Sequence, residues 1–331
     1  MRNLFKIKTF AILTIIALFS LASCSDDDTT TTNPTPTADN TIAAKAVATA
    51  DLSILVAALT KTNLVATLQG AGSFTVFAPN NAAFTALNIS VASINSSTPS
   101  EVESLKQILL NHVVSGATTS GQLTDNSYLR TFGLGAASTT NKLSMFVKKT
   151  TSASITTVKL NNNSTVTIPD IIASNGVIHI VDKVITAPTI IDLAAANSNF
   201  SSLAGALTTA SLITTLQGTG SFTVFAPDNT AFANLTTELA PVDPNTAQLT
   251  NVLKYHVVSG NYLQSNLPTV IAAGPTVTLN PQTIVISLTG GANITGSKVP
   301  ARPASKITTT DIQGNNGVIH VIDKVLLPAT F

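Results

Sequence analysis

The sequence predicts an α+β protein of two tandem domains, because most of the chain is written twice and helix signals precede strand signals in each copy. Residues 64–84 and 212–232 are identical at sixteen of twenty-one positions. Two later blocks repeat in the same order: NHVVSG at 111–116 with YHVVSG at 255–260, and NGVIHIVDKVI at 175–185 with NGVIHVIDKVL at 316–326. The copies start 148 residues apart, which is too long for a solenoid repeat, so each copy is expected to be a whole domain.

The first block combines helix and strand signals. Apolar residues recur at three- and four-residue steps from Leu52 to Leu59 and again from Phe200 to Leu207, which predicts a helix before each block. The segment SFTVFAP then alternates in polarity and ends at Pro79 or Pro227, which predicts a short strand.

The middle block is predicted to be a helix. Apolar residues from Val102 to Val113 fall on one face, and residues from Leu249 to Val257 repeat the pattern. Ser100 and Glu103 form a capping-box pattern at the expected start, and Gly116 suits the expected exit.

Strands are expected in the later part of each copy. The last block opens with Asn-Gly, a tight-turn signal, and continues as a β-branched strand. Residues 117–175 and 261–316 are rich in Thr, Val and Ile with Gly, Asn and Pro breaks, which predicts several short strands. Helices first and strands later are typical of the α+β class.

Composition excludes several kinds of site. The formal net charge is +1 and only 10% of the residues are charged, so no electrostatic footprint for nucleic acid is present. The chain has no Trp, which weighs against stacking platforms for single strands or sugars. Cys24 is the only cysteine, so the rest of the chain cannot form a disulfide, a Cys-ligated metal site or a thiol nucleophile.

The N-terminus is interpreted as a targeting segment. A basic start at 2–8 precedes the apolar run Phe10–Leu21, which is too short to span about 30 Å of hydrocarbon and is typical of a signal peptide, residues 1–23. The run ends in Leu21-Ala22-Ser23-Cys24, which resembles the lipobox of bacterial lipoproteins. This resemblance implies that Cys24 is lipidated; an ordinary signal peptide with an incidental Cys is the alternative.

The residues after Cys24 are interpreted as a tether, 24–40. Ser25-Asp26-Asp27-Asp28 resembles the signal that sends Bacteroidetes lipoproteins to the cell surface, the alternative being a solvated start to a linker. The Thr/Pro-rich segment that follows cannot bury a core and reads as extended. We therefore expect a lipid-anchored protein of the cell outer membrane, exposed on the surface, whose only contact with the membrane is its anchor.

The repeated blocks resemble the fasciclin domain family. The resemblance rests on TVFAPNNAAF and TVFAPDNTAF, the two HVVSG segments and the two segments that begin VIH and end DKV. It covers about residues 41–331 and implies two tandem domains, 41–187 and 188–331, each a wedge of short strands packed with helices. It also implies extracellular adhesion, between cells or from cell to matrix.

A Tyr-His pair in the middle block of the family is often linked to adhesion. Tyr255 and His256 match this pair, whereas the first copy departs from it with Asn111 and His112. These four residues are the candidate adhesion or binding residues, and the departure puts any Tyr-dependent contact of the first copy in doubt.

All four histidines lie in repeated blocks. His112 and His256 fall on the apolar helix face, and His179 and His320 fall in apolar strands. We interpret them as buried residues whose ring nitrogens are satisfied by hydrogen bonds, with a pH-sensitive contact or a metal site as the alternatives. The chain has no HExxH spacing for zinc, and we expect neither a metal nor a cofactor.

Four further polar residues are expected to serve the fold. Asn80 and Asp228 follow the strand-ending Pro and are placed to cap the next helix, a ligand contact being the alternative. Asp182 and Asp323 precede lysines in the last strand, and we expect each to accept a backbone or His hydrogen bond.

No enzyme motif is present in the sequence. The Gly-rich segments 70–72 and 218–220 precede strands and lack the Lys-Ser/Thr of a phosphate loop. The chain has no G-x-S-x-G elbow, and the copies share no carboxylate pair beyond the turn and strand positions, as a glycosidase would need. We expect a surface-anchored adhesion or binding protein, not an enzyme, whose partner is an extracellular protein, a matrix component or a polysaccharide. The alternative is an envelope lipoprotein that binds a carbohydrate or a small ligand.

Overall fold

The computed structural model describes residues 40–70, 72–152, 155–218, 220–239, 245–297 and 303–330. The predicted signal peptide, the lipidation site Cys24 and the tether up to residue 39 lie outside the described residues. We call residues 41–187 domain 1 and residues 188–331 domain 2. Among the described residues, no single helix is long and apolar enough to cross a membrane, and the pair Ile42–Ala48 and Ala50–Lys61, which together would be, is bent by 109°.

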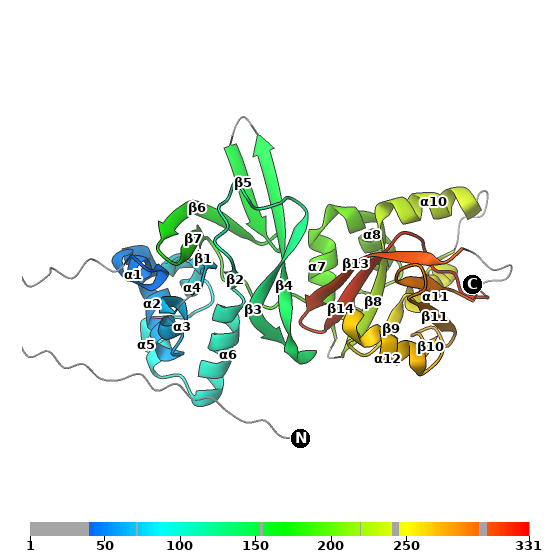
Figure 1. Cartoon of the computed structure of the whole chain (residues 1–331), viewed down its shortest axis with the longest axis horizontal. Helices are drawn as coiled ribbons and strands as arrows, with labels where there is room; N and C mark the ends of the chain where they lie inside the picture. Colours follow the sequence, from blue (N-terminus) through cyan, green and yellow to red (C-terminus); the bar gives the residue numbers. More distant parts are fainter. Residues whose placement is uncertain are drawn as a thin grey trace, which may run out of the picture. The chain divides into compact units, whose positions relative to one another are not determined.

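Domain 1 begins with helices and continues with strands (Figure 1). Its helices are α1 (Ile42–Ala48), η1 (Ala50–Leu52), α2 (Ser53–Lys61), α3 (Val65–Gln69), α4 (Asn81–Thr85), α5 (Val91–Asn95) and α6 (Pro99–Leu110). Its strands are β1 (Phe74–Pro79), β2 (Val113–Ser115), β3 (Ser127–Gly135), β4 (Ser138–Ser152), β5 (Ile155–Leu160), β6 (Ser164–Ala173) and β7 (Gly176–Val181).

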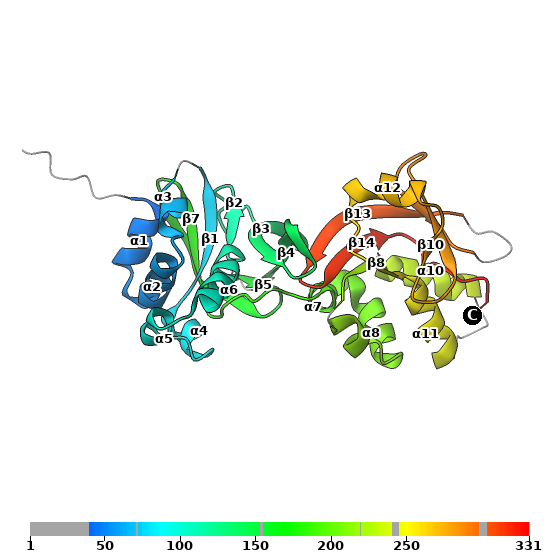
Figure 2. The same cartoon turned by 90° about the horizontal axis from the view of Figure 1, so that it is seen from below.

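The strands of domain 1 close into a barrel in the order β1 to β7. β1 runs parallel to β7, with Phe74 opposite Gly176 and Pro79 opposite Val181, and antiparallel to β2 on its other side. All six residues of β1 are buried, because barrel residues cover one face and the helices cover the other (Figure 2). The strand expected from SFTVFAP is therefore present, but it is buried on both faces rather than on one.

Domain 2 has a similar order of helices and strands, but it adds two helical segments between its second and third strands. Its helices are α7 (Ile190–Ala196), η2 (Ser198–Phe200), α8 (Ser201–Thr209), α9 (Ile213–Gln217), α10 (Asn229–Leu239), α11 (Thr246–Tyr255), η3 (Gln264–Asn266) and α12 (Leu267–Ala272). Its strands are β8 (Phe222–Pro227), β9 (Val257–Ser259), β10 (Thr276–Val277), β11 (Thr283–Ser287), β12 (Asn293–Thr295), β13 (Ser305–Gly314) and β14 (Gly317–Ile322). The predicted α+β class is confirmed.

The second sheet is open where the first is closed. Its strand order is β10-β11-β12-β13-β14-β8-β9, and β8 runs parallel to β14 as β1 does to β7. In domain 1, the nine-residue strand β3 joins β2 through the pair Val114 and Thr131. The corresponding strand β10 has two residues and forms ladder pairs with β11 alone.

Two expectations about the middle block are wrong. The capping box of α6 is formed by Thr98 and Glu101, not by Ser100 and Glu103. The reason is that Pro99 occupies the first helical turn, so the helix begins nearer the N-terminus than expected. The helix also ends at Leu110, before the VVS segment, which turns into strand β2 beside β1. Gly116 therefore follows a strand and not a helix.

The Asn-Gly turn of the last block connects the strands to the first helix of each domain. The side-chain oxygen of Asn175 accepts the N–H of Ile42 at 2.8 Å, and its amide donates to the carbonyl of Leu68 at 2.5 Å. Asn316 makes the same two contacts with Ile190 (3.0 Å) and Leu216 (2.7 Å). The turn thus ties α1 and α3, or α7 and α9, to the central strands.

Hydrogen bonds also join the two domains. Residues from Asn40 onward accordingly belong to one compact unit. The N–H of Ala136 donates to Oδ1 of Asn315 at 2.8 Å, and the N–H of Gln313 donates to the hydroxyl of Ser144 at 3.0 Å. Phe146 of β4 belongs to the apolar cluster of domain 2.

The glycine after each Asn is required by the close parallel strand. At Gly317 (φ 155°) an added Cβ would meet the carbonyl oxygen of Phe222 on β8, whereas at Gly205 in α8 it would meet nothing within 4 Å. We therefore expect Gly317→Ala to unfold domain 2 or to cost at least about 3 kcal/mol. Gly205→Ala should raise stability by about 0.5–1 kcal/mol, because Ala is the better helix former.

Urea unfolding of fragment 40–331 followed by circular dichroism measures both effects. Equal midpoints for Gly317→Ala and the unchanged chain would show that β8 and β14 are not packed this closely.

Candidate binding site

The two helix histidines are buried and bridge backbone groups. Nδ1–H of His112 donates to the carbonyl of Ile108 at 2.8 Å, and Nε2 accepts the N–H of Ile185 at 2.8 Å. In domain 2, His256 repeats both contacts, with Val252 at 2.7 Å and Leu326 at 2.9 Å. A backbone N–H can only donate, so each ring is neutral with its proton on Nδ1. Each ring joins the end of α6 or α11 to the segment that follows the last strand.

Burial fixes this charge state. His112 and His256 are each 2% exposed, and loss of hydration lowers the pKa of each ring from 6.5 to about 4, although the hydrogen bond to the preceding turn acts in the opposite direction. Both rings therefore stay neutral at physiological pH.

The residue before each of these histidines is also internal. Asn111, 1% exposed, donates to the carbonyl of Ile185 at 3.1 Å and accepts the hydroxyl of Thr131 at 3.1 Å. The hydroxyl of Tyr255, 0% exposed, donates to the carbonyl of Thr283 at 2.6 Å and accepts the N–H of Ser297 at 2.8 Å.

These positions require a correction to the candidate adhesion residues. Tyr255, His256, Asn111 and His112 all lie inside the folded domains, so none of their side chains can touch a partner there. These side chains pack among apolar neighbours and form hydrogen bonds with backbone groups near the end of each helix, which explains why the fold needs them. Any contact with a partner falls to other residues on the outer surface.

The two strand histidines belong to a second duplicated network. Nε2–H of His179 donates to the carbonyl of Thr118 at 2.9 Å, and Nδ1 accepts the N–H of Asp170 at 3.2 Å. His320 does the same with Tyr262 (2.8 Å) and Asp311 (3.4 Å). These rings carry their proton on Nε2, the opposite nitrogen from His112 and His256. Burial lowers the pKa of both.

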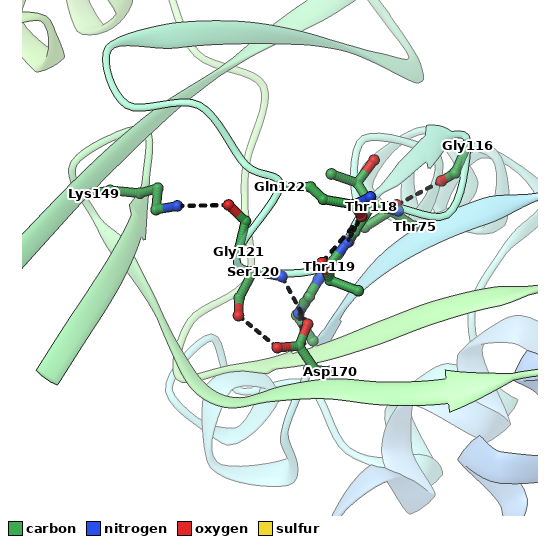
Figure 3. A network of polar contacts seen from close by, with 10 residues as sticks. Thr75, Gly116, Thr118, Thr119, Ser120, Gly121, Gln122, Lys149 and Asp170 are labelled. Atoms are coloured by element: carbon green, nitrogen blue, oxygen red, sulfur yellow. Dashed lines mark hydrogen bonds and ion pairs between the residues drawn. The ribbon is translucent and has the colours of Figure 1, made fainter. Parts of the chain in front are cut away.

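Asp170 connects this network to the loop after β2 (Figure 3). Its carboxylate accepts the N–H of Ser120 at 2.7 Å and the hydroxyl of Ser120 at 2.5 Å. Partial burial acts to raise the pKa of Asp170, but the two hydrogen bonds from Ser120 hold it below its usual value. On the other side of the loop, Lys149 donates to the carbonyl of Gly121 at 3.2 Å. The carboxylate thus fixes a loop and is not free for catalysis.

Asp170 and Asp311 were missed in the sequence. Each stands nine residues before a strand histidine and has a positive φ, 61° and 62°, at an irregularity in the pairing of β6 with β7 or of β13 with β14. Their identical spacing from His179 and His320 is the one signal that could have found them.

The other polar residues singled out in the sequence make local contacts. Asn80 and Asp228 cap α4 and α10 by accepting the N–H of Ala83 and of Ala231, each at 2.8 Å. Oδ1 of Asp182 accepts the N–H of Thr165 at 2.6 Å, and Oδ1 of Asp323 accepts that of Lys306 at 2.7 Å. Both aspartates therefore bond to backbone and not to a histidine.

Within the described ranges, no three His, Cys, Asp or Glu side chains come together as a metal site. The histidine, aspartate and asparagine side chains discussed above form internal hydrogen bonds that stabilise the fold. What the domains offer to another molecule is their outer surface, where loops and hairpins differ between the copies.

Known proteins share this architecture. The fasciclin domain model matches residues 50–187 and 198–328. An uncharacterized protein of Synechocystis is 38% identical over 141 residues, which are 42% of this chain and 98% of that protein. Human periostin is 30% identical over 266 residues, which cover 79% of this chain and 29% of periostin. The structure of a FAS1 domain pair from the insect cell adhesion molecule fasciclin I aligns with a TM-score of 0.51 and 19% identity, over 82% of this chain and 97% of that one.

The buried neutral histidines predict that stability depends on pH. The pKa of His112 and of His256 is about 4 when folded and about 6.5 when unfolded, so protonation favours the unfolded chain. Their contribution is complete above pH 6.5, falls as the pH drops toward 4 and levels off below that. Each ring should lower the free energy of unfolding by about 3 kcal/mol over this window.

Urea midpoints of fragment 40–331, measured from pH 7.5 to 4, test this dependence. The His112→Gln/His256→Gln variant should start less stable and show a flatter profile. A midpoint that stays constant between pH 6.5 and 4 in the unchanged fragment would contradict neutral, buried rings.

Removal of one hydroxyl tests the internal role of Tyr255. Tyr255→Phe leaves the carbonyl of Thr283 and the N–H of Ser297 without their partner, so we expect a loss of about 1–2 kcal/mol. Tyr262→Phe is the matched control, because that hydroxyl has no hydrogen-bond partner among the described residues, and it should change stability by less than about 0.5 kcal/mol. Equal effects in thermal unfolding would refute the assignment.

Proposed function

Because the chain belongs to the fasciclin domain family, we propose that it is an extracellular adhesion or binding protein, held at the cell surface by a lipid on Cys24. Its two domains act through their outer surfaces, and the partner is an extracellular protein, a matrix component or a polysaccharide. Fasciclin domains occur in an insect cell adhesion molecule, and that domain pair has the same fold as this chain.

The main support for this proposal is that the repeated polar residues form their hydrogen bonds inside the domains. The residues repeated in both copies, among them His112 and His179, bond to backbone groups inside each domain. Catalysis instead needs acid, base and nucleophile to converge on a cleft that a substrate can enter. A molecule whose repeated buried histidines serve the fold is suited to binding, and we infer that it is not an enzyme.

The N-terminal segment supports a location outside the cell. A lipid on Cys24 would hold the chain at a membrane, and the Thr/Pro-rich segment up to residue 40 would keep the domains away from it. Two linked domains can bind one extended partner with higher avidity than either domain alone.

Expression of the full chain in a bacterium that exports lipoproteins to its surface tests the function. We expect the cells to attach to surfaces coated with matrix protein or polysaccharide, and we expect soluble fragment 40–331 to compete. Cys24→Ser should abolish attachment because the anchor is lost, whereas soluble fragment 40–331, which lacks residue 24, should still bind the coated surfaces. The proposal would be contradicted if cells that display the chain on their surface attached no better than cells without it.

A small-ligand role is the second candidate, and one observation favours it. A groove of about 540 Å³ is lined by polar and apolar residues of both domains, among them Tyr128, Arg130 and Asp228. A carbohydrate or small ligand that raises the melting temperature of the fragment, with the effect lost in Arg130→Ala, would favour this role over adhesion.

A further inference from the structure

The basic residues of the chain are unevenly divided between the two domains. Domain 1 has nine Lys and Arg against six Asp and Glu, a balance of +3, whereas domain 2 has five against six, a balance of −1. Three of the nine lie in the paired ends of β4 and β5, at Lys148, Lys149 and Lys159. Figure 1 shows these strands projecting beyond the rest of domain 1. The hairpin therefore carries a third of the basic residues of domain 1.

Two of these lysines oppose each other across the hairpin. Lys148 and Lys159 are directly paired in the antiparallel ladder, so their side chains share one face. Like charges placed opposite each other destabilise a sheet. The ammonium group of Lys148 is compensated by an ion pair with Asp125 at 3.4 Å and a hydrogen bond to Oδ1 of Asn126 at 3.3 Å. Both partners of the ion pair are substantially exposed, so it contributes little.

The ammonium group of Lys159 is exposed and has no ion-pair or hydrogen-bond partner within the described part of the chain. An anion placed between Lys148 and Lys159 would turn their repulsion into two attractive contacts.

The same face carries hydroxyl groups beyond the lysine pair. Thr150 is paired with Thr157 on the next rung, about 7 Å along the strands, and Ser152 follows on β4. The opposite face differs, because Lys149 there is engaged with the carbonyls of Gly121 and Leu123. One face of the hairpin therefore presents the ammonium group of Lys159 (unpaired among the described residues), the half-exposed ammonium group of Lys148 beside Asp125, and a row of hydroxyls.

These groups fit a polysaccharide better than a nucleic acid. Hydroxyl side chains can donate to and accept from sugar hydroxyls, while the ammonium groups meet carboxylate or sulfate. The hairpin segment 147–160 contains no aromatic residue on which bases could stack.

Domain 2 supplies an internal comparison. The corresponding segment 276–295, with β11 and β12, contains no charged residue. The basic face is therefore a property of domain 1 alone and not a requirement of the shared fold.

We propose that the face of the β4–β5 hairpin that carries Lys148 and Lys159 binds an acidic polysaccharide. The two ammonium groups hold its carboxylate or sulfate groups, and the hydroxyls of Thr150 and Thr157 contact its sugar hydroxyls. This assignment rests on the proposed binding function and names its partner class and its place in the chain.

Binding of fragment 40–331 to immobilised alginate and dextran sulfate tests the assignment, with uncharged dextran as the control polymer. Lys148→Gln/Lys159→Gln should weaken binding about tenfold and should fold at least as well as the unchanged fragment, because it removes a repulsive pair. Lys45→Gln/Lys306→Gln removes the same charge elsewhere and should change affinity less than twofold. Binding should weaken steadily with added salt.

The outcomes separate this inference from the proposed function. Preference for alginate identifies carboxylate as the anion, and preference for dextran sulfate identifies sulfate. Equal loss in both double variants, equal binding to duplex DNA, or no binding to either acidic polymer overturns the inference. Should cells that display the chain still attach in that case, the adhesion proposal stands without it. Capture of the polymers without cell attachment would leave the inference intact and remove the adhesion role.

Discussion

The parallel pairing of two distant strands in the centre of each domain is the constraint on which the rest of the structure depends. β1 pairs with β7 and β8 with β14, and in domain 1 these strands are buried along their whole length. Three parts of the chain must meet for this to happen: the first block supplies β1, the last supplies β7, and the middle supplies β2 on the other side. These are the three blocks that the sequence repeats. Their polar residues, including His112 and Asn175, satisfy backbone groups that such deep burial leaves without water.

This arrangement separates the residues that hold the fold from those available to a partner. The interior is nearly the same in both domains, down to the ring nitrogen that carries the proton in each histidine pair. The outside differs: domain 1 has a closed barrel and a projecting basic hairpin, and domain 2 has an open sheet and an uncharged hairpin. Two copies of one scaffold therefore present different surfaces.

The sequence predicted what depends on local pattern. The repeats, the early helices, the short strand before Pro79 and the caps at Asn80 and Asp228 all depend on residues a few positions apart. The start of α6 was misplaced by two residues, because Thr98 and Ser100 offer similar caps and Pro99 decides between them.

What could not be predicted depends on long-range contacts. Asn175 bonds to a residue 133 positions away, and the bond of Asp170 to Ser120 spans 50 positions. Barrel closure in domain 1 depends on the pairing of Val114 with Thr131, which no local signal fixes. The candidate binding residues were misplaced for a related reason: a Tyr-His pair looks the same in sequence whether it faces water or the carbonyl of Thr283.

The charge state of the helix histidines tests most directly whether the duplicated polar residues serve the fold. Long-range proton–nitrogen NMR spectra of labelled fragment 40–331, recorded from pH 7.5 to 5.5, report the tautomer and the titration of each ring. The account predicts that His112 and His256 stay neutral with the proton on Nδ1 throughout, as their hydrogen bonds and a pKa of about 4 require. Rings that titrate near pH 6.5 with mixed tautomers would be open to solvent, and the separation between an internal scaffold and an external binding surface would fail.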